Sequence, residues 1–414
     1  MLEAVPVEFV LFAGVLAGVA IWSRQALKVA VFGAVLIATY KVAFSPFATG
    51  AGAAGLLGHL EHEWVTLANL LLLLLAFALL AKTFEDSGVP ALLPRWLPDD
   101  WKGGFVLLLL VFVLSAFLDN IAAAMIGGAA ARTLFDRKVH VGYVVAIVAA
   151  ANGGGAGSVV GDTTTSMMWI AGIAPLEIAA AFIGAGVALM LFGVVASRQQ
   201  QAYSPIRKDE ASGARIDWPR LLIVLCILLA AIAANLVVNR RFSAMSASVP
   251  FLGLSIWLAI GLTAIWRRPA WRLLPGAFRG ALFLLSLVLC ATMMPVERLP
   301  SASWQTTFGL GALSSVFDNI PLTALAIRQG GYDWGLLAYA VGFGGSMIWF
   351  GSSAGVAVAT MFPEARNVGL WLRHGWHVAL AYVIGFFVML ALLGFHPGVS
   401  PKMRAPVNGA SVAL

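Results

Sequence analysis

Long apolar runs, separated by short polar or glycine- and proline-rich stretches, follow one another along most of the chain. A helix needs about 20 apolar residues to cross the hydrocarbon core of a bilayer, whereas a strand of a membrane barrel needs about half as many. The runs therefore predict an all-α polytopic membrane protein. Spans are expected near 6–22, 29–46, 64–82, 141–171, 175–196, 219–238, 248–266, 278–295, 335–362 and 374–395.

Two further apolar runs, near 104–131 and 306–327, are each interrupted by an Asp-Asn pair within a repeated phrase. The phrase reads Leu-Ser-x-x-x-Asp-Asn-Ile, and in its first copy Asp119 and Asn120 form the pair. In the second copy, Asp318 and Asn319 form the pair. Each run could be a full span with a polar centre or a re-entrant hairpin, and Asp and Asn favour the hairpin because they cap helix starts well.

A glycine-rich polar stretch lies inside the span that follows each Asp-Asn pair, and the two stretches can be aligned. Aligning Gly154-Gly155 with Gly344-Gly345 also aligns Gly161 with Gly351 and sets Asp162 opposite Ser352. Glycines can serve close helix packing alone, but the neighbouring hydroxyls and carboxylate favour two discontinuous helices with an unwound centre. The helix-break backbone is expected to comprise Asn152, Gly154, Gly155, Gly161, Gly344, Gly345 and Gly351.

Lysine and arginine flank the spans and set an expected orientation. Most of the 26 basic residues fall on one side if the polar linker 197–218 is cytoplasmic and both interrupted runs are hairpins. The two hairpins then open to opposite faces, which predicts an inverted repeat. The expected units are N-terminal spans 1–63, a first repeat 64–196, the linker 197–218, intervening spans 219–277, a second repeat 278–395 and a tail 396–414.

Carboxylates at this depth are costly and usually mark an ion or proton site. Desolvation disfavours their ionised form unless a cation binds, so protons and a small metal cation would compete for the same oxygens. A small metal cation is therefore expected at Asp119, Asp162 and Asp318, although each could merely cap a broken helix. Further hard oxygen ligands are expected from Asn120, Asn319, Ser158, Thr163, Thr164, Ser346 and Ser352.

Composition excludes several classes of protein and of substrate. The 414 residues are 61% hydrophobic and 11% charged, which excludes an ordinary soluble domain. The net charge of +7 comes from span-flanking residues, so no nucleic acid partner is expected, and nothing indicates a cofactor. Lys41 lies near the outer end of its span, and no basic residue occupies a span centre, which favours cations over anions. Glu61-His62-Glu63 is expected in a short polar loop, with a surface metal site as the alternative.

The Asp-Asn hairpin, followed by a break ending in Gly161-Asp162-Thr163-Thr164-Thr165, resembles NhaD-type sodium/proton antiporters of the ion transporter superfamily. The second half agrees through Asp318-Asn319-Ile320-Pro321 and Gly351-Ser352-Ser353. The resemblance implies exchange of Na⁺ or Li⁺ for H⁺ by a moving transport unit, commonly in a homodimer, in a bacterial cytoplasmic membrane. Ala122-Ala123-Ala124 departs from the expected Pro-Thr-like continuation.

Two rival functions follow from the same motifs. The superfamily also contains citrate, dicarboxylate and arsenite carriers, so a carboxylate carrier is the first alternative. An intramembrane aspartyl protease is the second, because Gly161-Asp162 matches half of a Gly-x-Gly-Asp motif. Residue 159 is Val, however, so the first glycine of that motif is missing. A secondary transporter, not an enzyme, is therefore expected.

Overall fold

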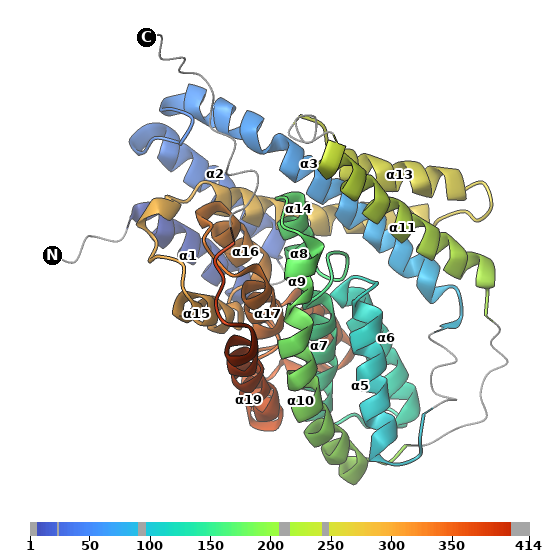
Figure 1. The fold of residues 1–414 in the computed structure, drawn as a ribbon. Helices are drawn as coiled ribbons and strands as arrows, with labels where there is room; N and C mark the ends of the chain where they lie inside the picture. The colour runs from blue at the N-terminus through green and yellow to red at the C-terminus, as the bar shows by residue number, and fades with distance from the viewer. Residues whose placement is uncertain (1–5, 23–24, 90–96, 207–215, 242–247, 399–414) are drawn as a thin grey trace.

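The computed structural model describes residues 6–22, 25–89, 97–206, 216–241 and 248–398 as a bundle of helices (Figure 1). The tail beyond residue 398 and residues 207–215 of the predicted linker lie outside the described residues. The α-helices are α1 (Val7–Ile21), α2 (Ala26–Phe44), α3 (Gly52–Glu85), α5 (Trp101–Ser115), α6 (Asn120–Leu134), α7 (Val141–Ala156), α8 (Thr163–Ile170), α9 (Pro175–Ala179), α10 (Ala181–Tyr203), α11 (Trp218–Arg241), α13 (Phe251–Thr263), α14 (Leu274–Thr292), α15 (Trp304–Ser314), α16 (Asn319–Gln329), α17 (Trp334–Gly344), α18 (Ser353–Met361) and α19 (Val368–Leu393).

The all-helical, polytopic fold class is confirmed for the described part of the chain. Five of its helical segments are long and apolar enough to cross a membrane, and they include α2, α3, α10, α14 and α19. Several further apolar helices, such as α5, α7 and α17, are shorter than a full crossing. Short apolar helices are what a chain with interrupted spans produces, because each interruption divides one run into two.

Two predicted boundaries are wrong. Helix α3 begins at Gly52, so Glu61-His62-Glu63 lies within a helix and not in a short polar loop. The described residues also contain no group of three His, Cys, Asp or Glu side chains that could hold a metal, so the metal alternative for this segment has no support. Helix α10 continues to Tyr203, beyond the predicted start of the linker, because Gln200 is buried and donates to the Lys138 carbonyl (Nε2···O 3.0 Å).

Each Asp-Asn pair lies at the turn of a helix pair. Asp119 is the N-cap of α6 and accepts the Ile121 N–H, and Asp318 is the N-cap of α16 and accepts the Ile320 N–H. The backbone angles of the two caps nearly coincide, with φ −55° and ψ 140° in the first and φ −50° and ψ 138° in the second. A capping aspartate at both turns is the local cause of the paired helices.

The two discontinuous helices also share their local geometry. The chain leaves α7 at Ala156 and enters α8 at Thr163 with Asp162 as N-cap, and it leaves α17 at Gly344 and enters α18 with Ser352 as N-cap. Both caps are extended, with φ −145°. Each break comes later than predicted, since Asn152, Gly154, Gly155 and Gly344 are still helical. Gly345 caps the end of α17, and Gly161 and Gly351 lie within the breaks.

The glycines allow the broken helices to approach the hairpin backbones. A Cβ atom on Gly154 would collide with the main chain of Phe112 in α5, and one on Gly344 would collide with the main chain of Gly311 in α15. In both halves a hairpin serine reinforces the contact. Ser115 Oγ donates to the Ala151 carbonyl at 2.6 Å, and Ser314 Oγ donates to the Val341 carbonyl at 2.7 Å.

We therefore expect Gly154→Ala to destabilise the protein, because two rigid backbones would have to separate to admit the methyl group. The midpoint of thermal unfolding in detergent, followed by tryptophan fluorescence, should fall by several degrees, corresponding to a loss of about 2 kcal/mol or more. Gly186→Ala in α10 is the matched control, since a Cβ there meets nothing within 4 Å. That control should gain up to about 1 kcal/mol from helix propensity. Equal midpoints for the two variants would contradict the close approach.

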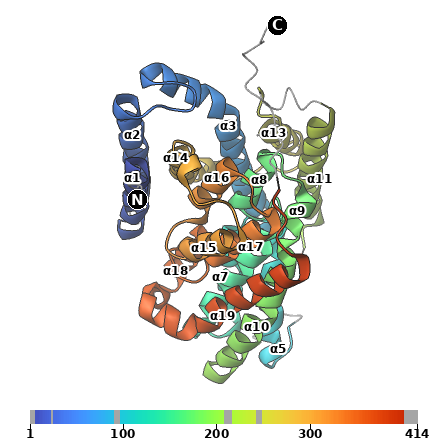
Figure 2. The ribbon, with the colours of Figure 1, turned by 60° about the vertical axis from the view of Figure 1, so that its left-hand side comes forward.

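The helices form two groups, which we call peripheral and central. The peripheral group comprises α1, α2, α3, α11, α13 and α14, and the central group comprises α5 to α10 and α15 to α19. Helices α7 and α17 lie in the middle of the central group and are buried almost throughout, as expected for helices that are apolar on every face. Figure 2 shows α14 between the α1–α2 pair and α16, and α14 contacts both α2 and α16.

Helices α6 and α16 finish in different parts of the molecule. At the linker end, where α10 finishes and α11 starts, Ser204 Oγ donates to the Phe135 carbonyl just beyond α6 (3.4 Å). The end of α16 instead lies beside the chain that follows α14, since Gln329 Nε2 donates to the Pro300 carbonyl (2.7 Å). Helix α3 runs between the two ends, and its linker end is fixed by the bond from Asp217 N to the Ser87 carbonyl (2.8 Å).

Candidate ion site

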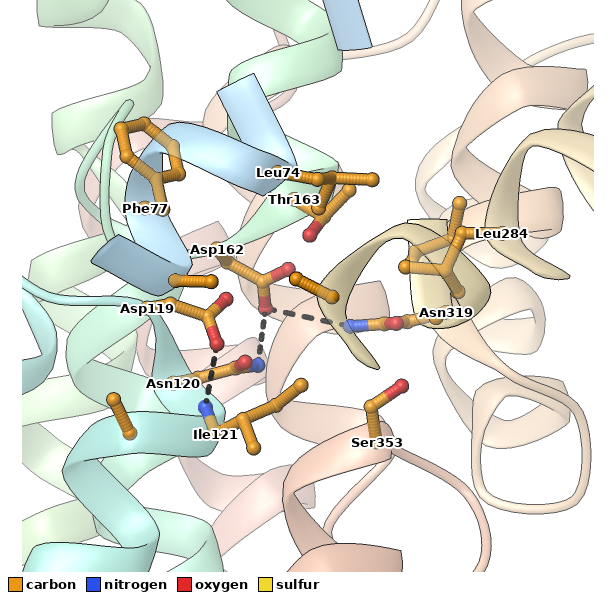
Figure 3. Close-up of a pocket in the computed structure, with 15 residues that line it drawn as sticks. Leu74, Phe77, Asp119, Asn120, Ile121, Asp162, Thr163, Leu284, Asn319 and Ser353 are labelled. Carbon is orange, nitrogen blue, oxygen red and sulfur yellow. Dashed lines mark hydrogen bonds between the residues drawn. The ribbon is translucent and has the colours of Figure 1, made fainter. Parts of the chain in front are cut away.

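A cavity of about 280 Å³ lies between the two hairpin turns, the start of α8 and the peripheral helices α3 and α14 (Figure 3). Its apolar wall includes Leu74, Phe77 and Leu284 from the peripheral group. Its polar lining comes from the central group and consists of Asp119, Asn120, Asp162, Thr163, Asn319 and Ser353. The cavity is therefore at the boundary between the two groups of helices.

Asp162 is the centre of the polar network. Its side chain is almost wholly buried, at 2% exposure, and its Oδ1 accepts the Thr164 N–H at 2.9 Å as the cap of α8. Its Oδ2 accepts from Asn120 Nδ2 at 3.0 Å and from Asn319 Nδ2 at 3.3 Å (Figure 3). The two hairpins, which are far apart in the sequence, thus both donate to one carboxylate oxygen.

Asn152 extends this network into the second broken helix. It is fully buried in α7, and its Oδ1 accepts from Asn120 Nδ2 at 3.1 Å. Its Nδ2 donates at 3.0 Å to both Ser346 Oγ and Ser352 Oγ, which belong to the break before α18. The sequence predicts only a helix-break backbone role for Asn152. The available signal was a lone amide side chain in an otherwise apolar and small-residue helix.

Asp119 and Asp318 occupy the hairpin turns but face different cavities. Asp119 lines the cavity described above, whereas Asp318 lines a neighbouring cavity of about 240 Å³ beside α1 and α14. Ser353 lines both cavities, and its Oγ donates to Asp318 Oδ2 at 3.3 Å. Sequence alignment of the two halves singled out Ser352 and missed Ser353, which follows it at the first position of α18.

The other predicted oxygen ligands surround the site in different ways. Thr163 lines the cavity, while Thr164 contributes its main-chain N–H to Asp162 from a buried position. Ser158 Oγ donates to the Ala116 carbonyl at 2.5 Å, which ties the first break to the first hairpin turn. Ser346 and Ser352 accept from Asn152, as described above. Their roles as ion ligands stay predictions.

The charge around the two cavities is negative. No lysine, arginine or histidine is among the described residues that line either cavity. The carboxylates are close enough to act on one another, Asp162 on Asp119 and Asp318 on Asp162. Like charges in a desolvated site repel strongly, so a bound cation or a proton relieves the repulsion. The arrangement is suited to holding small cations and protons in competition.

Comparison with known proteins agrees with a transport role. The sequence profile of the citrate transporter family, CitMHS, matches residues 16–344, about four fifths of the chain. A curated relative, Sodium/proton antiporter 1 of Arabidopsis thaliana, is 28% identical over 343 residues, covering 72% of this chain and 56% of the relative. The chain thus spans little more than half the length of that relative. Because the matched family region includes Asp119, Asp162 and Asp318, and most of the chain around them, the chain belongs to the citrate transporter family of the ion transporter superfamily and is a multi-pass secondary transporter.

Proposed function

We propose that this protein exchanges Na⁺ or Li⁺ for H⁺ by alternating access, with Asp162 as the central ligand. The observation that carries the proposal is the anionic cavity, where Asp119 and Asp162 line the wall and no basic side chain is among the described lining residues. A carboxylate cluster of this kind binds either a dehydrated cation or protons, and competition between them is sufficient for exchange. The name of the relative from Arabidopsis thaliana supports the same pair of ions.

The proposed exchange requires access from both faces of the membrane in turn. We propose that the two helix-turn-helix units are re-entrant hairpins of an inverted repeat, a view that the matching N-cap angles of Asp119 and Asp318 support. The central group of helices would then be the transport unit, moving against the peripheral group. In support, the cavity lies at the boundary between the groups, with an apolar wall from α3 and α14 along which the polar side could slide.

The orientation in the membrane, the type of membrane and the oligomeric state are part of the same proposal. A cytoplasmic face at the linker end is supported by the basic residues at that end, including Arg132, Lys138 and Arg220. A bacterial cytoplasmic membrane and a homodimer are expected from the resemblance to NhaD-type antiporters.

A carboxylate carrier is the second candidate, and the description of the matched family as a citrate transporter favours it. A multiply charged carboxylate would need cationic partners at its site. The described lining of the central cavity provides none, so such a substrate would have to enter together with cations. The absence of basic side chains from the described lining favours cation exchange over carboxylate transport.

Everted membrane vesicles test the two candidates directly. With an acid-inside pH gradient established, adding Na⁺ or Li⁺ should dissipate the gradient in vesicles that contain the protein and not in vesicles that lack it. The same preparation should be assayed for sodium-dependent uptake of labelled citrate. Citrate uptake without any cation-induced change in the gradient would replace cation exchange with carboxylate transport.

A further inference from the structure

A second polar cavity, of about 470 Å³, lies at the end of the molecule opposite the linker. It is bounded by α1, α2, the end of α16 and the 3₁₀ turn Val296–Arg298 that follows α14. The cavity therefore joins the peripheral group to the second hairpin. Its charged lining residues are Glu8, Lys41, Glu297, Arg298 and Arg328.

Lys41 is the most unusual of these residues. It lies in the last turn of α2 and is only 5% exposed. Its Nζ lies 5.1 Å from the centre of the Phe47 ring, and no described carboxylate is within ion-pair distance of it. The described carboxylate with the largest electrostatic effect on Lys41 is Glu8 of α1, which accepts a hydrogen bond from Ser45 Oγ at 2.5 Å. A desolvated ammonium without an ion pair is costly, so an anion in the cavity would stabilise it.

Arg298 and Arg328 add further positive charge to the cavity lining. Neither Arg298 nor Arg328 forms an ion pair among the described residues, although Glu63 and Glu297 act on Arg328 at longer range. The lining thus presents three cationic side chains against two carboxylates. Guanidinium groups have planar, paired donors that match the oxygens of carboxylates and phosphates.

We propose that this cavity is an oxyanion site, in which Lys41, Arg298 and Arg328 hold a phosphate or carboxylate group that is not the transported ion. Arg328 lies in the last turn of α16, whose first residue, Asn319, donates to Asp162. A bound anion would therefore tie the second hairpin to α2 and oppose its movement against the peripheral helices. The anion could be soluble, such as inorganic phosphate, or the headgroup of an anionic lipid.

The test is thermal stabilisation of the purified full chain, first in lipid-free detergent with inorganic phosphate against chloride at equal ionic strength. The second arm compares nanodiscs of phosphatidylcholine with nanodiscs that also contain phosphatidylglycerol. We expect the oxyanion to raise the unfolding midpoint of the wild type. Lys41→Met and Arg328→Gln should each weaken the apparent affinity by about tenfold or more. The matched control is Arg132→Gln, which removes a charge from the equivalent last turn of α6, away from the cavity.

Stabilisation by phosphate in detergent assigns the site to a soluble anion, and stabilisation by phosphatidylglycerol alone assigns it to a lipid headgroup. Either result supports the proposal if the two cavity variants lose the effect and Arg132→Gln retains it. The proposal is overturned if neither anion stabilises the wild type, or if Arg132→Gln loses as much as the cavity variants. Binding is measured without any sodium or proton gradient, so the result is independent of the proposed exchange.

Discussion

Asp162→Asn is expected to abolish cation-driven dissipation of the pH gradient while leaving the protein folded. Asparagine caps helices as well as aspartate does, so the start of α8 should persist. The substitution removes the carboxylate to which both hairpins donate. Losing about 3 kcal/mol of interaction with the cation would lower its affinity roughly 100-fold. Exchange in everted vesicles and sodium binding to the purified protein are the measurements.

Asp333→Asn is the matched control for this variant. Asp333 is also a helix N-cap, since its Oδ1 accepts the Leu336 N–H at the start of α17, but it does not line the central cavity. Its replacement should leave exchange within about twofold of the wild type, because the cap is retained. Full exchange in Asp162→Asn would refute the carboxylate mechanism, as would an equal loss in both variants.

Asn152→Ala is expected to destabilise the protein and to impair exchange, because one side chain joins both broken helices and the first hairpin. The substitution removes three buried hydrogen bonds, one each to Asn120, Ser346 and Ser352. Each lost hydrogen bond costs about 1 kcal/mol, and a polar atom left unpaired in the interior costs more, so we expect a loss of at least about 3 kcal/mol. The measurements are the thermal unfolding midpoint in detergent and exchange in vesicles.

Asn367→Ala is the matched control, because it shows how much stability is lost when an asparagine outside this network is replaced. Asn367 caps α19 from an exposed position, where its Oδ1 accepts the Leu370 N–H at 3.0 Å. Removing that cap should cost only about 1 kcal/mol. If Asn152→Ala were no less stable than Asn367→Ala, the network around Asn152 would not hold the two halves together.

The elements around the site could be predicted because each has a local cause in the sequence. The interrupted runs near 104–131 and 306–327 correspond to α5–α6 and α15–α16, since an Asp-Asn pair in apolar sequence stops one helix and caps the next. The positions of Asp119, Asp162 and Asp318 at helix starts follow from the same property. Their gathering in space depends on packing between distant segments, joined by hydrogen bonds between residues up to 200 positions apart, which no local pattern encodes.

The details that the sequence did not reveal depend on tertiary contacts. Ser352 is the extended N-cap of α18 and Ser353 is its first helical residue, and the two side chains contact different partners, Asn152 and Asp318. The role of Asn152 could not be predicted, because it depends on α7 lying beside the break between α17 and α18. The start of α3 at Gly52 was missed because hydropathy marks the membrane-crossing part of a helix and not its polar extension.

The direction of the hydrogen bonds around Asp162 has a consequence for the leakage of protons. Asn120 and Asn319 present amide nitrogens to the carboxylate, and Asn152 presents its amide nitrogen to the serines of the other break. Side-chain amides hold their hydrogens firmly and do not titrate near neutral pH. No proton can therefore hop along this chain of residues, although it runs through the middle of the polar interior. We therefore expect a proton to reach Asp162 from the cavity that this carboxylate lines, and not through the amide network.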